Sequence, residues 1–284
     1  MRDSLMARLD RFAPVKEVAQ IGAAIGREFS YELIAAVAPH SERELDQALA
    51  QLTASGLAFH QGTPPYAVYT FKHALVRDAA YDSLLKSRRQ ELHGKIAKVI
   101  EERLPNIEAT EPELLAYHYT EAKRPDKAIP LWRKAGSLAL NRLALAEAIA
   151  HLNKGLELVV ALPVSAERDG KELELRCLLG PTWTALKGWP AQEVWDSLHP
   201  ALTLANALRR SDALAPIFWG LFANVHTRGR AAESRHWAAQ AMDAAETYGD
   251  PDLVIIAHMA VADAYFFLGD PGKSREGADR VLAL

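Results

Sequence analysis

The segment most suggestive of nucleotide binding is residues 269–274 (GDPGKS), which ends like the phosphate-binding Gly-Lys-Ser of a P-loop. That loop needs its first glycine at position 267, which is Phe267 here. It also needs a preceding strand, whereas an apolar helical pattern comes before this segment. We therefore predict that residues 269–274 form an ordinary turn between two helices.

The sequence lacks the usual motifs of metal sites and of catalytic nucleophiles. The ten histidines are scattered, no His-Glu-x-x-His or Gly-x-Ser-x-Gly segment occurs, and there is one cysteine. Cys177 lies within an apolar helical pattern and is expected to be a small buried hydrophobe. We predict no catalytic residues, no metal ligands and no enzymatic activity for this chain.

His73 is the candidate binding residue, because it stands where a strand-like pattern changes to a helical one. Backbone N–H groups point outward at the start of a helix, so an imidazole there is well placed to meet an anion. The alternative is a capping or partly buried histidine without a ligand.

Several short elements surround His73. The spacing of Leu5, Leu9 and Phe12 and of later apolar residues predicts three or four short helices over residues 4–56. Ser41 and Glu44 are spaced as a capping box. Between residues 57 and 71 the apolar period becomes two, which predicts one β-hairpin. We predict a winged-helix domain over residues 1–105, with a trailing basic helix at residues 86–98.

The remainder, residues 111–284, is predicted to be an α-α superhelix of tetratricopeptide-like repeats that is incomplete at its C-terminal end. Bulky and small residues from Trp132 to Gly155 follow the tetratricopeptide spacing. Gly188, Gly229 and Gly269 recur at intervals of 41 and 40 residues, and such a period is typical of stacked helix pairs. The tryptophans at 183, 189, 195 and 219 are expected to be core or groove aromatics.

Charge argues against nucleic acid. The chain carries a net charge of −3, and the third predicted helix, residues 41–55, has Glu42, Glu44 and Asp46 against Arg43 alone. The basic helix is expected to be a solvated or partner-facing surface. Neither a secretory signal nor an apolar stretch of membrane-spanning length is present, so a cytoplasmic location is expected.

Four segments carry a resemblance to a known class: residues 20–29 (QIGAAIGREF), 71–81 (FKHALVRDAAY), 114–122 (LLAYHYTEA) and 127–132 (KAIPLW). They resemble the region that follows the ATPase module in STAND-class signalling ATPases. The most similar of these proteins also contain a class III adenylate cyclase domain and a tetratricopeptide tail.

The resemblance implies a regulatory region in which a winged helix acts on a nucleotide-binding domain and the repeats bind a partner. His73 would correspond to the histidine that contacts the β-phosphate of ADP, although the aspartate that follows it in the family is Ala74 here. ATP or ADP would then belong to the longer parent protein. Two alternatives stay open: a stand-alone tetratricopeptide scaffold, and a transcriptional regulator with a DNA-binding winged helix.

Overall fold

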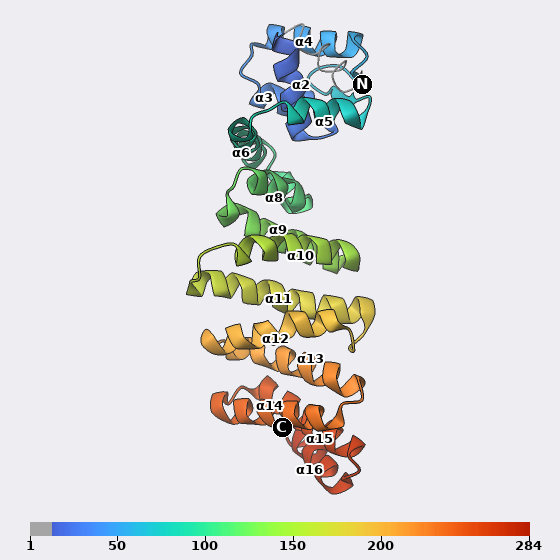
Figure 1. Cartoon of the computed structure of the whole chain (residues 1–284), viewed down its shortest axis with the longest axis vertical. Coiled ribbons are helices and arrows are strands. Elements are labelled where there is room, and N and C mark those ends of the chain that lie inside the picture. Colours follow the sequence, from blue (N-terminus) through green and yellow to red (C-terminus); the bar gives the residue numbers. More distant parts are fainter. Residues whose placement is uncertain (1–12) are drawn as a thin grey trace. The chain divides into compact units, whose positions relative to one another are not determined.

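The computed structural model describes residues 13–284. They divide into a first compact unit, which extends to Leu131, and a second, Trp132–Leu284. Each unit is treated by itself below. The chain is mainly α-helical, as predicted (Figure 1). The helix expected from Leu5, Leu9 and Phe12 lies outside the described residues.

The first unit combines short helices with one small sheet. Its elements are α2 (Ala13–Ile25), β1 (Glu28–Ser30), α3 (Tyr31–Val37), α4 (Glu42–Ala54), β2 (Ala58–Gln61), β3 (Val68–Phe71), α5 (Ala74–Asp82), α6 (Lys86–Arg103), α7 (Pro105–Thr110) and α8 (Pro112–Glu121). Helix α9 (Pro125–Asn141) begins in the first unit and ends in the second. The predicted domain boundary, between residues 105 and 111, falls on α7 within the first unit.

The prediction of a lone β-hairpin was incomplete, because the sheet has three antiparallel strands in the order β1-β3-β2. Strand β1 pairs Phe29 with Tyr69 of β3, and their rings stack with centroids 5.7 Å apart. Phe29 also lies against α2, where a Cβ on Gly22 would be 2.6 Å from the ring. This aromatic packing stabilises a strand that is too short to show a period in the sequence. The winged-helix assignment itself stays a prediction.

Helix α4 confirms the predicted capping box. The Ser41 side chain accepts from the Glu44 backbone N–H, and the Glu44 carboxylate accepts from the Ser41 backbone N–H at 3.0 Å. Two donors at the start of the helix are thereby satisfied. The buried stripe of Leu45, Leu49 and Leu52 then fixes α4 in the core of the first unit.

The second unit consists of stacked antiparallel helices, which confirms the prediction of stacked helix pairs (Figure 1). After α9 come α10 (Leu145–Val160), α11 (Ala166–Lys187), α12 (Gln192–Ala207), the short 3-10 helix η1 (Ser211–Ala213), α13 (Leu214–Thr227), α14 (Ala231–Tyr248), α15 (Pro251–Phe267) and α16 (Pro271–Leu282). Each helix packs on its sequence neighbours, and α13 also contacts α15.

Glycines end three helices at regular intervals. Gly188, Gly229 and Gly269 have φ values of +85°, +74° and +76°, a left-handed conformation that glycine adopts without steric penalty. They form the turns α11–α12, α13–α14 and α15–α16. The predicted turn therefore lies at Gly269 and Asp270, and residues 271–274 already belong to the first turn of α16. Asp270 caps α16 there by accepting from the Lys273 backbone N–H at 3.1 Å.

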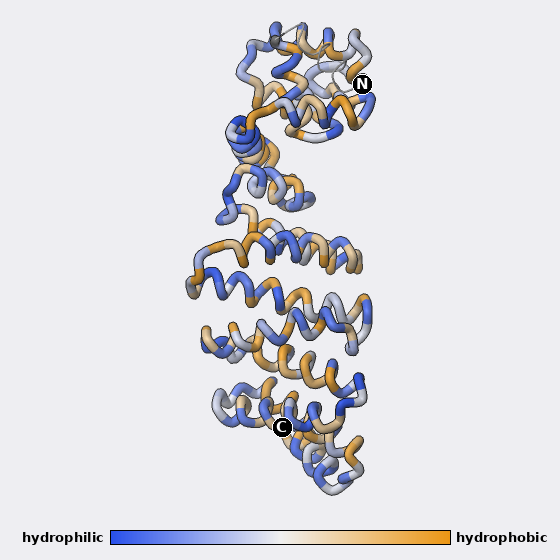
Figure 2. Tube along the Cα trace, viewed as in Figure 1, coloured by the Kyte–Doolittle hydropathy of each residue, from blue (hydrophilic) through white to orange (hydrophobic). Residues whose placement is uncertain are grey.

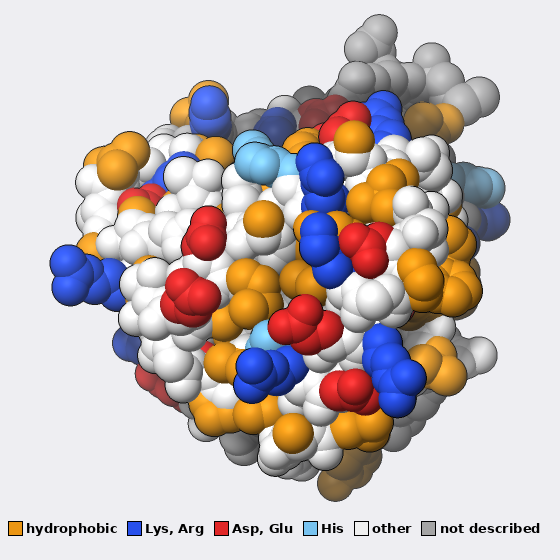
Figure 3. All heavy atoms as spheres, turned by 90° about the horizontal axis from the view of Figure 1, so that it is seen from below, with side chains coloured by type: hydrophobic (Ala, Val, Ile, Leu, Met, Phe, Trp, Pro, Cys, Tyr) orange, Lys and Arg blue, Asp and Glu red, His pale blue; other side chains and the backbone are white. Residues whose placement is uncertain are grey.

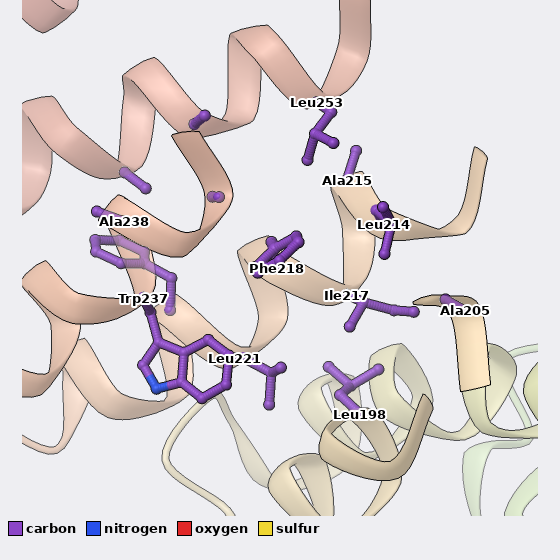
Figure 4. Packing of buried hydrophobic residues seen from close by; sticks show 14 of the residues in the cluster. Leu198, Ala205, Leu214, Ala215, Ile217, Phe218, Leu221, Trp237, Ala238 and Leu253 are labelled. Atoms are coloured by element: carbon purple, nitrogen blue, oxygen red, sulfur yellow. The ribbon is translucent and has the colours of Figure 1, made fainter. Parts of the chain in front are cut away.

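The core of the second unit centres on α13, which is apolar along most of its length (Figure 2). Leu198 of α12 reaches two glycines, Gly180 of α11 and Gly220 of α13, and a Cβ on either glycine would overlap its side chain. Trp237 of α14 lies beside Phe218 and Leu221 (Figure 4). Small residues at the helix crossings thus allow large side chains to interdigitate.

Every helix among residues 13–284 falls short of the length or apolarity needed to cross a bilayer.

Candidate functional site

His73 is exposed, and it precedes α5 without capping that helix through its side chain. Its backbone carbonyl accepts from the Val76 backbone N–H at 3.0 Å, which fixes the first turn. The imidazole is therefore open to contact by another molecule or domain. The predicted role of His73 in binding ADP stays a prediction.

Three of the segments quoted for the resemblance meet in the first unit around a pocket of about 280 Å³. The C-terminal end of α2 with Gly26, the α5 residues Arg77, Asp78 and Tyr81, and Tyr117 of α8 line this pocket. The Arg77 guanidinium donates to the Asp78 carboxylate from Nε at 2.9 Å. These two charges compensate each other, so the pocket offers no net charge to an anion.

Behind Tyr81 lies a buried hydrogen-bonded chain that links α5, α6 and α8. The Tyr81 hydroxyl is 2.9 Å from Nε2 of His93, and Nδ1 of His93 is 2.8 Å from Nδ1 of His118. Both histidines are fully buried, and Nε2 of His118 has no hydrogen-bond partner. Because two protonated Nδ1 atoms would repel at this distance, one imidazole donates and the other accepts. This pair therefore requires at least one neutral histidine.

Burial sets the charge of this histidine pair. Loss of solvation lowers the pKa of His93 to about 4, with a contribution from the Arg89 charge. The same cause, together with His93, lowers the pKa of His118 to about 3. Burial also raises the pKa of Tyr81 to about 12. The chain of groups is neutral at pH 7, which makes it a structural connection rather than a source of acid or base catalysis.

The expectation for the basic helix was wrong at His93, which lies inside the unit and not on a charged surface. Its spacing to Ile96 and Ile100 on the buried face of α6 was the signal that could have shown this. His118 likewise follows Leu115 by three residues on the buried face of α8. The two histidines are 25 residues apart in the sequence, so helical spacing alone does not reveal their contact.

Cys177 of α11 packs against the core of the second unit, as predicted for a small hydrophobe. Burial raises the pKa of its thiol to about 11, so the thiolate is scarce at neutral pH.

In the second unit, the turns α11–α12, α13–α14 and α15–α16 lie at the same ends of their helices (Figure 1). Trp189, His226, Arg228, Phe266 and Phe267 from these turns form what we call the turn-edge surface. Trp189 is 36% exposed, and Phe266 and Phe267 are 67% and 66% exposed. The tryptophans were expected to be core or groove aromatics: Trp183, Trp195 and Trp219 pack against the core, whereas Trp189 is partly exposed.

The turn-edge surface is continuous across the three hairpins. His226 stacks on Phe222 and meets the ring of Phe267 with centroids 4.6 Å apart. Arg228 donates from Nε to the Pro190 carbonyl at 2.9 Å. Among the described residues Arg228 has no carboxylate partner, so its positive charge remains beside the exposed aromatic rings. Aromatic residues and arginine in this arrangement are typical of protein-binding hot spots.

No family model matches the chain. A protein of Rhizobium meliloti (strain 1021), described only as uncharacterised, is 25% identical over 219 residues, which is 76% of this chain and 21% of that protein. The chain thus spans about a fifth of the length of this curated relative.

Two solved structures are similar in part. BtubC (BKLC) from P. vanneervenii has a TM-score of 0.48 and 13% identity, covering 73% of this chain and 84% of that chain. A Signal Transduction ATPase with Numerous Domains, with a tetratricopeptide repeat sensor, from Pyrococcus horikoshii has a TM-score of 0.42 and 13% identity, covering 95% and 44%. Both TM-scores are below 0.5, so neither similarity determines the function of this chain.

Proposed function

We propose that this chain is a non-catalytic regulatory and protein-interaction region of a STAND-type signalling ATPase, of the kind linked to adenylate cyclases. The second unit binds a protein partner, and the first unit transmits that event to a nucleotide-binding domain in a longer protein. The observation that carries the proposal is the turn-edge surface, because exposed aromatic rings on consecutive hairpins are unfavourable in water unless a partner covers them.

The partner is a protein segment with apolar and acidic side chains. Phe266 and Phe267 supply apolar area, and the uncompensated charge of Arg228 favours a carboxylate beside it. Arg228 is already held by the α11–α12 turn, so little side-chain entropy is lost when it binds.

Site-specific photo-crosslinking in the native cell tests this surface. A photoreactive phenylalanine replaces Trp189 or Phe267 in turn, and Val164 provides the control. Val164 is 82% exposed and lies in the α10–α11 connection, at the opposite ends of the helices. We expect the same partner band from positions 189 and 267 and none from 164. Crosslinks of equal yield from all three positions, or from none, would reject the surface.

For the first unit, we infer that a nucleotide-binding domain contacts His73, whose exposed imidazole at the start of α5 supports this role. In the longer protein, His73→Ala is expected to weaken ADP retention, and the exposed His60 provides the control variant His60→Ala. Equal ADP dissociation rates in the wild type and both variants would favour a scaffold without a nucleotide switch.

A further inference from the structure

A groove of about 510 Å³ lies in the second unit and is formed by α14, α15 and α16. Its floor is a stripe of α15, from Val254 through His258 and Val261 to Tyr265. Met242 and Ala245 of α14 form one wall, and Lys273, Gly277 and Arg280 belong to α16. The volume lies within the range of about 300–1,000 Å³ that is typical of small-molecule sites. Figure 3 shows apolar side chains among charges of both signs at this end of the unit.

The preceding hairpin shows what normally fills such a groove. Shifted by the 40-residue period, Gly277 corresponds to Trp237 and His258 corresponds to Phe218. Trp237 is only 8% exposed, and its indole packs against Trp195 of α12 with centroids 5.6 Å apart. The earlier groove is thus filled by a tryptophan from its own wall, whereas the last groove has no side chain at that position.

Gly277 allows α16 to pack closely on α15. Helix α16 approaches α15 so closely that a Cβ on Gly277 would be 3.0 Å from the His258 carbonyl oxygen and 3.0 Å from the Ala262 backbone nitrogen. A larger residue at this position would push the two helices apart. At the position that corresponds to Trp237, the last groove is therefore lined by the Gly277 backbone and not by a side chain.

Charged groups at one end of the groove have no partners. Glu246 lies near the end of α14 and Arg280 near the end of α16, and both ends adjoin the start of α15 because neighbouring helices are antiparallel. Neither side chain takes part in a hydrogen bond or an ion pair within the part of the chain that the structure describes. Lys273, at the other end, is 3.6 Å from Asp270 and lies over the ring of Tyr265.

We propose that this groove binds a free aromatic α-amino acid. The ring occupies the groove over Val261, between α14 and α16. The carboxylate of the ligand pairs with Arg280, whose planar guanidinium suits bidentate binding, and its ammonium group pairs with Glu246. The ring of such a ligand complements the apolar floor of the groove, and its two opposite charges complement Arg280 and Glu246.

Isothermal titration calorimetry of the whole chain with L-tryptophan tests the proposal, with L-phenylalanine, L-leucine, tryptamine and N-acetyl-tryptophanamide as comparisons. We expect saturable binding of the aromatic amino acids. We also expect at least about tenfold weaker binding of tryptamine and of the blocked amide, since each lacks at least one charge and an ionic hydrogen bond contributes about 1.5–3 kcal/mol. Equal binding of leucine, or tighter binding of the blocked amide, would overturn the proposal.

Two variants locate the ligand. Arg280→Gln is expected to weaken L-tryptophan binding about tenfold but to leave tryptamine unaffected, because tryptamine has no carboxylate. Arg275→Gln is the matched control, since Arg275 is on the same helix, is 85% exposed and does not line the groove. Val261→Trp fills the groove and is expected to abolish binding, with far-UV circular dichroism establishing that the helices remain. Unchanged L-tryptophan affinity in both Arg280→Gln and folded Val261→Trp would refute the site.

Discussion

Acid is expected to unfold the first unit through its two buried imidazoles. In the folded state His93 and His118 stay neutral, with pKa values lowered to about 4 and about 3. In the unfolded chain the pKa of a histidine is about 6.5. The unfolded state therefore binds more protons below pH ~6.5, and the linkage relation gives a stability that falls as the pH falls from that value toward the folded pKa values. Above this window the pair contributes no pH dependence to the stability.

The size of the effect follows from these pKa values. One pKa unit corresponds to about 1.4 kcal/mol, so the pair together removes on the order of 6 kcal/mol at pH ~4. Domains of this kind have unfolding free energies of roughly 5–15 kcal/mol. The histidine pair thus removes a large part of the stability of the first unit before the pH falls below about 4, the range in which exposed carboxylates themselves become protonated.

The double variant His93→Phe/His118→Leu removes both imidazoles together and leaves neither with an unpaired nitrogen. We expect its first unit to lose much less stability than that of the wild type between pH ~7 and pH ~5. In this range the two histidines contribute most of the change in unfolding free energy with pH. Amide hydrogen exchange in α6 and α8 is the measurement, because all six tryptophans lie at or beyond residue 132 and report on the second unit. His73→Gln, at an exposed histidine, is the control. The same pH slope in the double variant and the wild type would refute the reasoning.

Three further predictions concern stability and reactivity. Ser41→Ala removes the capping hydrogen bonds of α4 and is expected to destabilise the first unit by about 1 kcal/mol in urea unfolding. Gly220→Ala forces a Cβ against Leu198 and is expected to destabilise the second unit by roughly 1–3 kcal/mol. In a Leu198→Ala background the same change should be nearly harmless, and strict additivity in the double-mutant cycle would contradict the packing described. Cys177, with its thiol pKa raised to about 11, should react with iodoacetamide at pH ~8 only after unfolding, whereas rapid labelling of the folded chain would argue against its burial.

The helical pattern of the sequence predicted most of the fold because it reflects local physics. The Ser41–Glu44 cap and the left-handed glycines at 188, 229 and 269 act within a few residues, so their spacing was sufficient. Strand β1 was not predicted, since its stability comes from pairing Phe29 with Tyr69, 40 residues away. A three-residue strand has no period of its own from which it could be recognised.

The sites were less accessible from the sequence. The position of His73 before a helix was correctly anticipated, but its binding role depends on a domain that the helical pattern does not describe. The groove of α14–α16 is lined by Gly277 where the preceding hairpin has Trp237, and this difference appears only when the two hairpins are compared in three dimensions. The His93–His118 contact similarly requires α6 and α8 to be packed together.

Hydroxyl-radical footprinting tests most directly whether the turn-edge surface binds a protein partner. The reactivities of Phe266 and Phe267, about two-thirds exposed in the chain by itself, are compared between purified protein and native cells, with Val164 as internal reference. We expect both phenylalanines to be protected several-fold in the cell while Val164 reacts equally in both. Equal reactivity of all three residues in the two settings would contradict the proposed function.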